Sequence, residues 1–267
     1  MDKVERFIRF ACDGRTAYGR LDKDTVYELK EPPFQSIDPT GDSFALSEVS
    51  LLTPCEPSKV IAVGLNYASH RKHVEKEEGV FVTVSGRPAP ANHPVVFAKF
   101  ATSLIPHEAD IIFPPEATNV HFEGELGLVI GKTAKAVSIS DARKHVFGVT
   151  ICNDLVDREW LLGNLQWVRA KGADGFGPMG PAIVTGLDYG KLKLETRVNG
   201  EVRQSSSTSE LVFSPDTLLS YISQYVTLVP GDVVFTETPG QTQQIHKGDV
   251  IEIDIENVGT LRNRVAG

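Results

Sequence analysis

The chain has 267 residues, of which 41% are hydrophobic and 23% are charged, as in a globular protein with a substantial core. Its formal net charge of −8 argues against nucleic acid or an anionic membrane surface as the main partner. The three cysteines, Cys12, Cys55 and Cys152, form no CxxC pair, so the sequence indicates neither a zinc site nor a disulfide framework.

The targeting signals of the sequence can also be checked. The first residues carry charges through their apolar part and show no secretory pattern, and no apolar run approaches the roughly 18 residues of a membrane helix. We therefore expect a cytoplasmic protein that contacts neither a membrane nor nucleic acid.

The N-terminal part predicts a small β domain. Short alternating runs over residues 4–30, separated by Asp13-Gly14 and by residues 22–24, predict a β-meander. Residues 31–43 are rich in Pro, Gly and Asp, which predicts a linker. We place the boundary near residue 57, so that a small domain spans residues 1–57 and a larger domain spans residues 58–267.

A polar segment follows the buried strand predicted at residues 60–64. Residues 69–78 have helix-forming composition, with Ser69 as a plausible N-cap. Residues 79–94 then hold several glycines and prolines and predict a long loop. A polar helix followed by such a loop is typical of a mobile lid, and also of an ordinary surface excursion.

Strands dominate the remaining sequence. Asn199-Gly200 predicts a type I′ hairpin turn between two strand-like runs. Helices are expected at residues 140–145, 155–165 and 216–228, the last from its apolar spacing. Because no βαβ alternation appears, we predict an α+β fold that is mostly β, not a doubly wound sheet.

Residues 121–131 read as one strand ending at a glycine. Alternation would point Phe122, Leu126, Leu128 and Ile130 into the core, and His121, Glu123 and Glu125 to the opposite face. Two carboxylates on one face repel each other, and Mg²⁺ is a common compensating cation for such pairs. The alternative is an edge strand whose two glutamates simply face water.

Asp154 and Lys171 extend this candidate site. Asp154 directly follows an apolar strand, so it lies at a strand end, and three carboxylates with Mg²⁺ would leave room for a bidentate 2-oxo acid. The alternative for Asp154 is a turn or helix cap. Lys171 lies among glycines in a loop, although most lysines are simply surface residues.

Seven short segments carry a resemblance to a known family. They occur in order at residues 64–70, 97–99, 121–131, 153–158, 166–178, 236–240 and 259–263. Together they resemble the fumarylacetoacetate hydrolase superfamily, in particular its acylpyruvate hydrolases and 2-hydroxyhepta-2,4-diene-1,7-dioate isomerases. The resemblance implies a mixed β-sandwich roll with a small N-terminal β domain, a homodimer, and a bound Mg²⁺ or Mn²⁺.

The resemblance also implies roles for individual residues. It implies Glu123, Glu125 and Asp154 as metal ligands, and Lys171 and His70 as catalytic residues, Lys171 stabilising an oxyanion and His70 activating water. It further implies that the substrate is bound by Lys99, Arg158 and Thr238, of which Thr238 would contact its carboxylate.

The implied reaction is Mg²⁺-dependent hydrolysis of a C–C bond in an acylpyruvate-type 2-oxo acid, through a metal-stabilised pyruvate enolate. The alternatives at the same site are oxaloacetate-type decarboxylation and 2-hydroxymuconate-type isomerisation. A non-catalytic paralogue that binds metal and ligand is the alternative from another class.

Three positions depart from the family pattern. His73 stands where many members have a glutamate one helical turn after the histidine, and no glutamate lies three or four residues from His70. Leu161 replaces a substrate-contacting glutamine, and Glu237 replaces a glycine, adding bulk and charge beside a carboxylate-binding loop. The missing acidic partner favours decarboxylation or isomerisation, which need no hydroxide attack.

Overall fold

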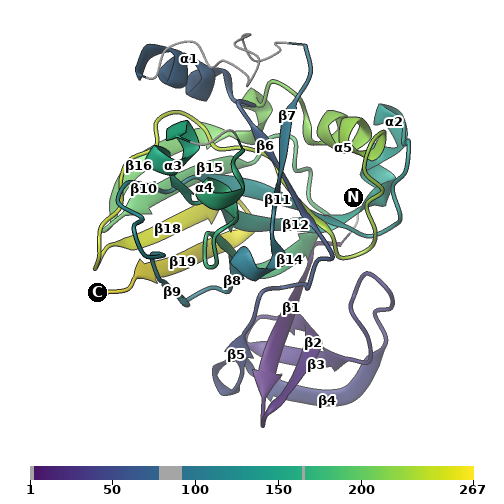
Figure 1. Ribbon diagram of the computed structural model, residues 1–267. Helices are drawn as coiled ribbons and strands as arrows, with labels where there is room; N and C mark the ends of the chain where they lie inside the picture. The colour runs from purple at the N-terminus through teal and green to yellow at the C-terminus, as the bar shows by residue number, and fades with distance from the viewer. Residues whose placement is uncertain (1–2, 78–91, 164–165) are drawn as a thin grey trace.

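The computed structural model describes residues 3–77, 92–163 and 166–267, and the chain there is mostly β (Figure 1). Its strands in these ranges form sheets of twelve, five and two strands. The predicted α+β, mostly β fold class is confirmed.

The largest sheet runs in the order β4-β3-β2-β1-β14-β12-β11-β17-β6-β7, with β5 on β1 and β8 on β14. Its strands are β1 (Glu5–Cys12), β2 (Arg15–Asp22), β3 (Thr25–Leu29), β4 (Pro39–Ala45), β5 (Ser50–Leu51), β6 (Val60–Gly64), β7 (Val95–Lys99), β8 (Leu104–Ile105), β11 (Gly124–Ile130), β12 (Val146–Asn153), β14 (Gly177–Thr185) and β17 (Val233–Phe235).

The five-stranded sheet runs in the order β16-β15-β18-β19-β9, and a separate pair is formed by β10 and β13. These strands are β9 (Asp110–Ile111), β10 (Val120–His121), β13 (Val156–Asp157), β15 (Lys193–Val198), β16 (Glu201–Ser207), β18 (Val250–Ile255) and β19 (Gly259–Val265). The helices are α1 (Ala68–Glu77), α2 (Ile139–Ala142), α3 (Arg158–Gly163), α4 (Val168–Gly172) and α5 (Pro215–Ser223), with short 3₁₀ turns at Leu46–Glu48, Ala101–Ser103, Arg143–His145 and Thr208–Glu210.

The N-terminal strands form the meander that the sequence predicts. Asp13 and Gly14 turn the chain between β1 and β2 with positive φ angles of 49° and 76°. The linker predicted at residues 31–43 is wrong from residue 39 onward, because β4 begins at Pro39 and pairs with β3. A proline is tolerated there because β4 is the edge strand of the sheet.

These N-terminal strands continue the main sheet, since β1 pairs with β14 (Glu5↔Thr185). In Figure 1 they project from the rest of the chain as a purple lobe. The boundary near residue 57 stays a prediction.

The main core lies between the twelve-stranded and five-stranded sheets. Leu126, Leu128 and Ile130 of β11 pack there in one cluster with side chains of β18 that include Ile251 and Ile253. The inward face predicted for residues 122–130 is therefore confirmed. Each such side chain contributes about 1.5–3 kcal/mol by leaving water.

Gly124 allows the two sheets to approach closely at the start of β11. A Cβ at this position would collide with Oγ1 of Thr196 on β15 and crowd the side chain of Ile253 on β18. The predicted continuous strand is also interrupted here, because β10 ends at His121 and β11 begins at Gly124. Glu123 lies in this break and Glu125 follows it.

The helices largely follow the sequence predictions. α1 matches the helix predicted at residues 69–78, but it begins at Ala68, so Ser69 lies inside it and is not its N-cap. The helix predicted at 216–228 is α5, which Ser214 caps by accepting a hydrogen bond from the N–H of Thr217 (3.2 Å). The helix predicted at 155–165 is represented by the shorter α3. None of the helices in the described ranges combines the length and the apolar character needed to cross a membrane.

The loop predicted as a lid at residues 79–94 falls mostly at positions 78–91, which lie outside the described residues.

One edge of the large sheet collects four chain segments. β6 and β17 are parallel, β11 is antiparallel to β17, and β12 is antiparallel to β11. The carboxyl ends of β6, β12 and β17 therefore meet the amino end of β11. Residues 64–70, 123–125, 153–158 and 236–240 are brought together at this edge.

Candidate metal and active site

Three buried carboxylates meet at this edge. Glu123, Glu125 and Asp154 each place an oxygen within 4.8 Å of the others, and their residues are 4%, 0% and 1% exposed. The backbone holds the group: the N–H of Asp154 donates to the carbonyl of Glu123 (2.9 Å), and the side chain of Asn153 accepts from the N–H of Glu123 (2.9 Å). The structure thus brings together the three side chains that the sequence singled out.

The electrostatics of these carboxylates fit a divalent cation. Burial raises the pKa of Glu125 well above its ordinary value, and the neighbouring Asp154 and Glu237 raise it further. Oε1 of Glu125 is buried and has no hydrogen-bond partner among the described residues. An all-carboxylate set of this kind suits a hard cation such as Mg²⁺ or Mn²⁺.

Lys171 supplies positive charge beside the carboxylates. The prediction that it lies in a loop is wrong, because residues 168–172 form the short helix α4. Its Nζ is 2.8 Å from Oδ2 of Asp154 and in direct contact with Glu123. Burial alone would lower the pKa of Lys171, but the two carboxylates outweigh it and the pKa is raised. Lys171 therefore stays a cationic hydrogen-bond donor at the wall of the pocket.

Lys99 lies on the far side of Asp154. Its Nζ is 2.7 Å from Oδ1 of Asp154 and also donates to the backbone carbonyl of Lys171. Burial lowers the pKa of Lys99, and Asp154 partly offsets this. Lys99 does not appear among the described residues that line the pocket, so its contacts are those of a side chain that fixes Asp154 and α4.

A pocket opens onto Glu123, Lys171 and His70. Its described lining combines charged groups with apolar side chains: Val63, Gly64, Leu65, His70, Phe97, Glu123, Arg158, Leu161, Trp167, Lys171 and Glu237. Leu161, one of the three departures from the family pattern, contributes an apolar wall there.

Arg158 connects the pocket to a second polar group. Its Nη2 donates to Oγ1 of Thr242 (2.8 Å) and lies 3.5 Å from Oε1 of Glu123. The alternation predicted that His121 shares a face with Glu123 and Glu125, and this prediction is wrong. The ring of His121 instead contacts Oγ1 of Thr242 (3.0 Å) and Oδ1 of Asn119 (3.0 Å). The reason is the break between β10 and β11, which uncouples His121 from the alternation of the following strand.

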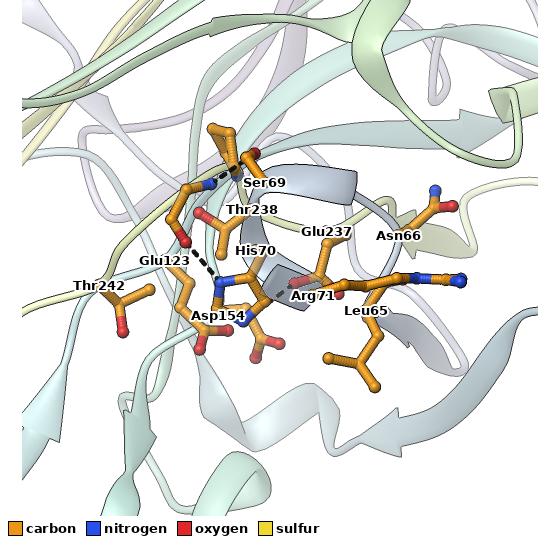
Figure 2. A network of polar contacts seen from close by, with 12 residues as sticks. Leu65, Asn66, Ser69, His70, Arg71, Glu123, Asp154, Glu237, Thr238 and Thr242 are labelled. Carbon is orange, nitrogen blue, oxygen red and sulfur yellow. Dashed lines mark hydrogen bonds and ion pairs between the residues drawn. The ribbon is translucent and has the colours of Figure 1, made fainter. Parts of the chain in front are cut away.

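His70 is held by the loop that follows β17 (Figure 2). A carbonyl can only accept, so Nδ1 of His70 carries the proton and donates to the carbonyl of Gly240 (2.7 Å). Burial lowers the pKa of His70 to about 4, against the opposing effect of Glu123. The imidazole is therefore neutral near pH 7, with Nε2 unprotonated.

Nε2 of His70 faces a carboxylate after all. Oε1 of Glu237 lies 3.7 Å from it, and both residues are buried (Figure 2). The expectation that Glu237 adds bulk and charge beside a carboxylate-binding loop is incomplete, because its side chain turns toward His70. His73 lies farther away, with its ring centroid 6.3 Å from that of His70.

The loop around Glu237 is anchored from two other segments. Nδ2 of Asn66 donates to the carbonyl of Thr236 (3.2 Å), and Nε2 of Gln204 donates to Oγ1 of Thr238 (2.9 Å) and to the carbonyl of Pro239 (2.7 Å). Thr238 is fully buried and does not line the pocket. Sequence reasoning missed Gln204 and Thr242, since neither lies in a segment that carried the resemblance.

Family models match both parts of the chain. The model of the family described as "Fumarylacetoacetate (FAA) hydrolase C-terminal" matches residues 59–266, and "Rv2993c-like, N-terminal" matches residues 5–54. A bovine protein named oxaloacetate tautomerase FAHD2A, mitochondrial, is 40% identical over 232 residues, which cover 82% of this chain and 70% of that protein.

Two mycobacterial proteins are similar over almost the whole chain. Protein Rv2993c of Mycobacterium tuberculosis is 40% identical over 97% of both chains. A crystal structure of a 5-carboxymethyl-2-hydroxymuconate delta-isomerase from Mycobacterium smegmatis is 40% identical, covers 98% of this chain and 99% of that chain, and superposes with a TM-score of 0.88. The chain therefore belongs to the fumarylacetoacetate hydrolase family.

Proposed function

We propose that this chain is a divalent-metal-dependent enzyme that interconverts the keto and enol forms of a 2-oxo dicarboxylic acid of the oxaloacetate or 2-hydroxymuconate type. The observation that carries the proposal is the pocket that His70, Lys171 and Arg158 line beside the cluster of Glu123, Glu125 and Asp154. The tautomerase and isomerase names of two relatives support the same reaction class.

Glu123, Glu125 and Asp154 would hold Mg²⁺ or Mn²⁺. When bound, the metal would polarise the 2-oxo carbonyl as a Lewis acid and favour negative charge on its oxygen.

The side chains of the pocket supply the proton transfer. His70 accepts a proton from C3 of the substrate at Nε2, the C3–H electrons form the C2–C3 double bond, and the carbonyl electrons move to O2, which then takes up a proton. Lys171 donates a hydrogen bond to O2 while the charge develops. The guanidinium of Arg158 pairs with a substrate carboxylate. The substrate-binding roles of Lys99 and Thr238 stay predictions, and both side chains have contacts within the protein, to the carbonyl of Lys171 and to Gln204 respectively.

Hydrolysis of an acylpyruvate, the reaction that the resemblance implies, is the second candidate. The contact between His70 and Glu237 supports it, since an imidazole beside a carboxylate can take a proton from water. The absence of an acidic partner on α1 therefore no longer favours isomerisation over hydrolysis. Decarboxylation of oxaloacetate needs only the charge stabilisation by Lys171 and the metal, and a non-catalytic paralogue would convert nothing.

A substrate panel with the Mn²⁺-loaded protein tests these candidates. Enolic oxaloacetate, a 2-hydroxymuconate and two acylpyruvates are followed by ultraviolet absorbance, and the products are separated by chromatography. We expect ketonisation to be the fastest reaction, and Lys171→Met to reduce it strongly while Lys144→Met, on an exposed lysine, leaves it unchanged. Cleavage of acylpyruvates alone would favour the hydrolase, and no conversion at all would favour the paralogue.

A further inference from the structure

We propose that Glu237 is the acidic partner of His70, and that it replaces from the β17 loop the carboxylate that α1 lacks at position 73. The proposal rests on the proposed function, in which His70 transfers a proton at Nε2. Glu237 touches no substrate atom in this scheme; it orients the imidazole and stabilises it when Nε2 is protonated.

The hydrogen bonds of His70 determine which atom needs a partner. Nδ1–H is already committed to the carbonyl of Gly240 at 2.7 Å. Nε2 is therefore the atom that gains and loses a proton, and Oε1 of Glu237 lies 3.7 Å from it. The N–H of Gly240 also donates to Oγ of Ser69 (3.1 Å), so the same loop fixes the helix turn that carries His70. One loop thus supplies both the backbone contact and the carboxylate.

Glu237 is placed by contacts that leave its carboxylate directed at His70. Its backbone N–H donates to Oε2 of Glu125 (2.9 Å), which anchors the main chain. Its side chain is buried beside Gly64, where an added Cβ would lie 3.9 Å from Oε2 of Glu237, and this oxygen has no hydrogen-bond partner among the described residues. The backbone of Asn66 also stabilises the carboxylate against the burial that raises its pKa, and His70 is the side chain that Oε1 faces.

The backbone conformation at Glu237 is strained for any residue other than glycine. Its φ angle is +98°, in a region that glycine adopts readily and other residues rarely do. Glycine would fit the turn without strain, so an incidental side chain is a poor explanation for a glutamate here. Strain of this kind is commonly retained where a side chain has a functional contact.

His73 cannot act as the acidic partner of His70. It lies on α1 one helical turn after His70, but an imidazole cannot become a carboxylate-like anion, and its Nδ1 is buried without a hydrogen-bond partner among the described residues. A competing role for Glu237 is that of a fourth metal ligand, since its main chain contacts Glu125. The two roles differ in what a Glu237→Gln change does to metal affinity.

The experiment is a double-mutant cycle on the full-length Mn²⁺-loaded protein, using Glu237→Gln, His70→Asn and the double variant. Glutamine keeps the backbone donor to Glu125 and the shape of the side chain. We expect Glu237→Gln to lower kcat about a hundredfold with KM changed by less than about threefold, and to change kcat by less than about threefold when His70→Asn is already present. Glu28→Gln, a buried glutamate paired with Arg15 in the N-terminal lobe, is the matched control.

Three results would overturn the proposal: an unchanged kcat for Glu237→Gln, additive losses in the cycle, or a loss of Mn²⁺ affinity in calorimetry that accounts for the fall in kcat. Failure of the proposed function is recognised separately, because the wild-type protein would then convert nothing in the panel. In that case the ¹⁵N-histidine NMR spectrum still tests whether Glu237 contacts His70. A shifted Nε2 resonance of His70 in Glu237→Gln, and not in Glu28→Gln, supports the contact, and an unshifted resonance overturns it.

Discussion

The Nζ atom of Lys171 lies 2.8 Å from Oδ2 of Asp154, so an ammonium group from α4 is bound to the carboxylate at the end of β12. The same ammonium contacts Glu123, whereas Oε1 of Glu125 is buried without a hydrogen-bond partner among the described residues. The three carboxylates are therefore not equivalent. Glu125 is the one whose charge is least compensated by the described side chains.

We expect Glu125→Gln to lower the affinity for Mn²⁺ by at least about a hundredfold, because an amide oxygen replaces a charged ligand. Isothermal titration calorimetry on protein treated with a chelator measures the change. The surface variant Glu256→Gln should bind Mn²⁺ as the wild type does. Equal affinities for Glu125→Gln and the wild type would remove Glu125 from the metal site.

The metal-free protein should lose stability in mild acid through His70. Its pKa falls from an ordinary 6.5 to about 4 on folding, because the ring is buried. Between these values the unfolded chain binds a proton that the folded chain does not, so stability is full above pH 6.5 and falls as the pH is lowered toward 4.

At pH 5 the contribution of His70 to this loss is on the order of 2 kcal/mol. Urea unfolding at pH 7 and pH 5 measures it. His70→Asn should show a smaller difference between the two pH values, and His246→Asn, at an exposed position, should show the wild-type difference. A His70→Asn variant that loses as much stability as the wild type would contradict the prediction.

Glu237→Gly should make the protein more stable and less active at the same time. Removing a non-glycine residue from φ +98° should raise the free energy of unfolding by about 1 kcal/mol. Glu237→Ala removes the carboxylate but keeps the backbone strain, so it should lose activity without that gain. Thermal unfolding and kcat together distinguish the variants, and a Glu237→Gly protein less stable than Glu237→Ala would argue against strain.

A carboxylate at position 73 should also be able to act as the acidic partner of His70. Adding His73→Glu to Glu237→Gly restores a carboxylate one helical turn after His70, at the position used by many family members. We expect the double variant to regain at least about tenfold in kcat over Glu237→Gly. No recovery, with α1 intact by circular dichroism, would mean that the helix cannot present a carboxylate to this ring.

Gln204 should matter to catalysis although it lies outside the pocket. Gln204→Leu leaves the carbonyl of Pro239 and the hydroxyl of Thr238 without their donor, which costs about 1–3 kcal/mol in a buried site. We expect faster hydrogen exchange over residues 236–242 and a lower kcat. Gln244→Leu, which removes an exposed contact to Thr118, is the control, and unchanged exchange in Gln204→Leu would refute the anchoring role.

The sequence predicted local features where one or two residues determine the backbone. Asp13-Gly14 and Asn199-Gly200 both form the expected tight turns, with positive φ at each residue. The alternation after Gly124 correctly assigned Leu126 and Leu128 to the core. The linker prediction failed at Pro39 because an edge strand tolerates residues that usually mark a loop.

The candidate site was predictable only in part. Glu125 lies on β11, Glu123 directly precedes this strand, and Asp154 directly follows its antiparallel neighbour β12, so pattern and resemblance together could place them side by side. The pairing of His70 with Glu237 could not be inferred in this way. It depends on β6 and β17 being parallel neighbours, and this pairing of distant segments has no local sequence signal.

The loop after β17 connects a predicted metal ligand with the proposed proton acceptor. Its residue 237 holds Glu125 through the main chain, and its residue 240 holds His70 through a carbonyl. Any displacement of this short segment is transmitted to the metal ligand and to the proton acceptor together. Metal affinity and proton transfer should therefore change together in variants that displace the main chain of this loop, whereas Glu237→Gln keeps both main-chain contacts and should change proton transfer alone.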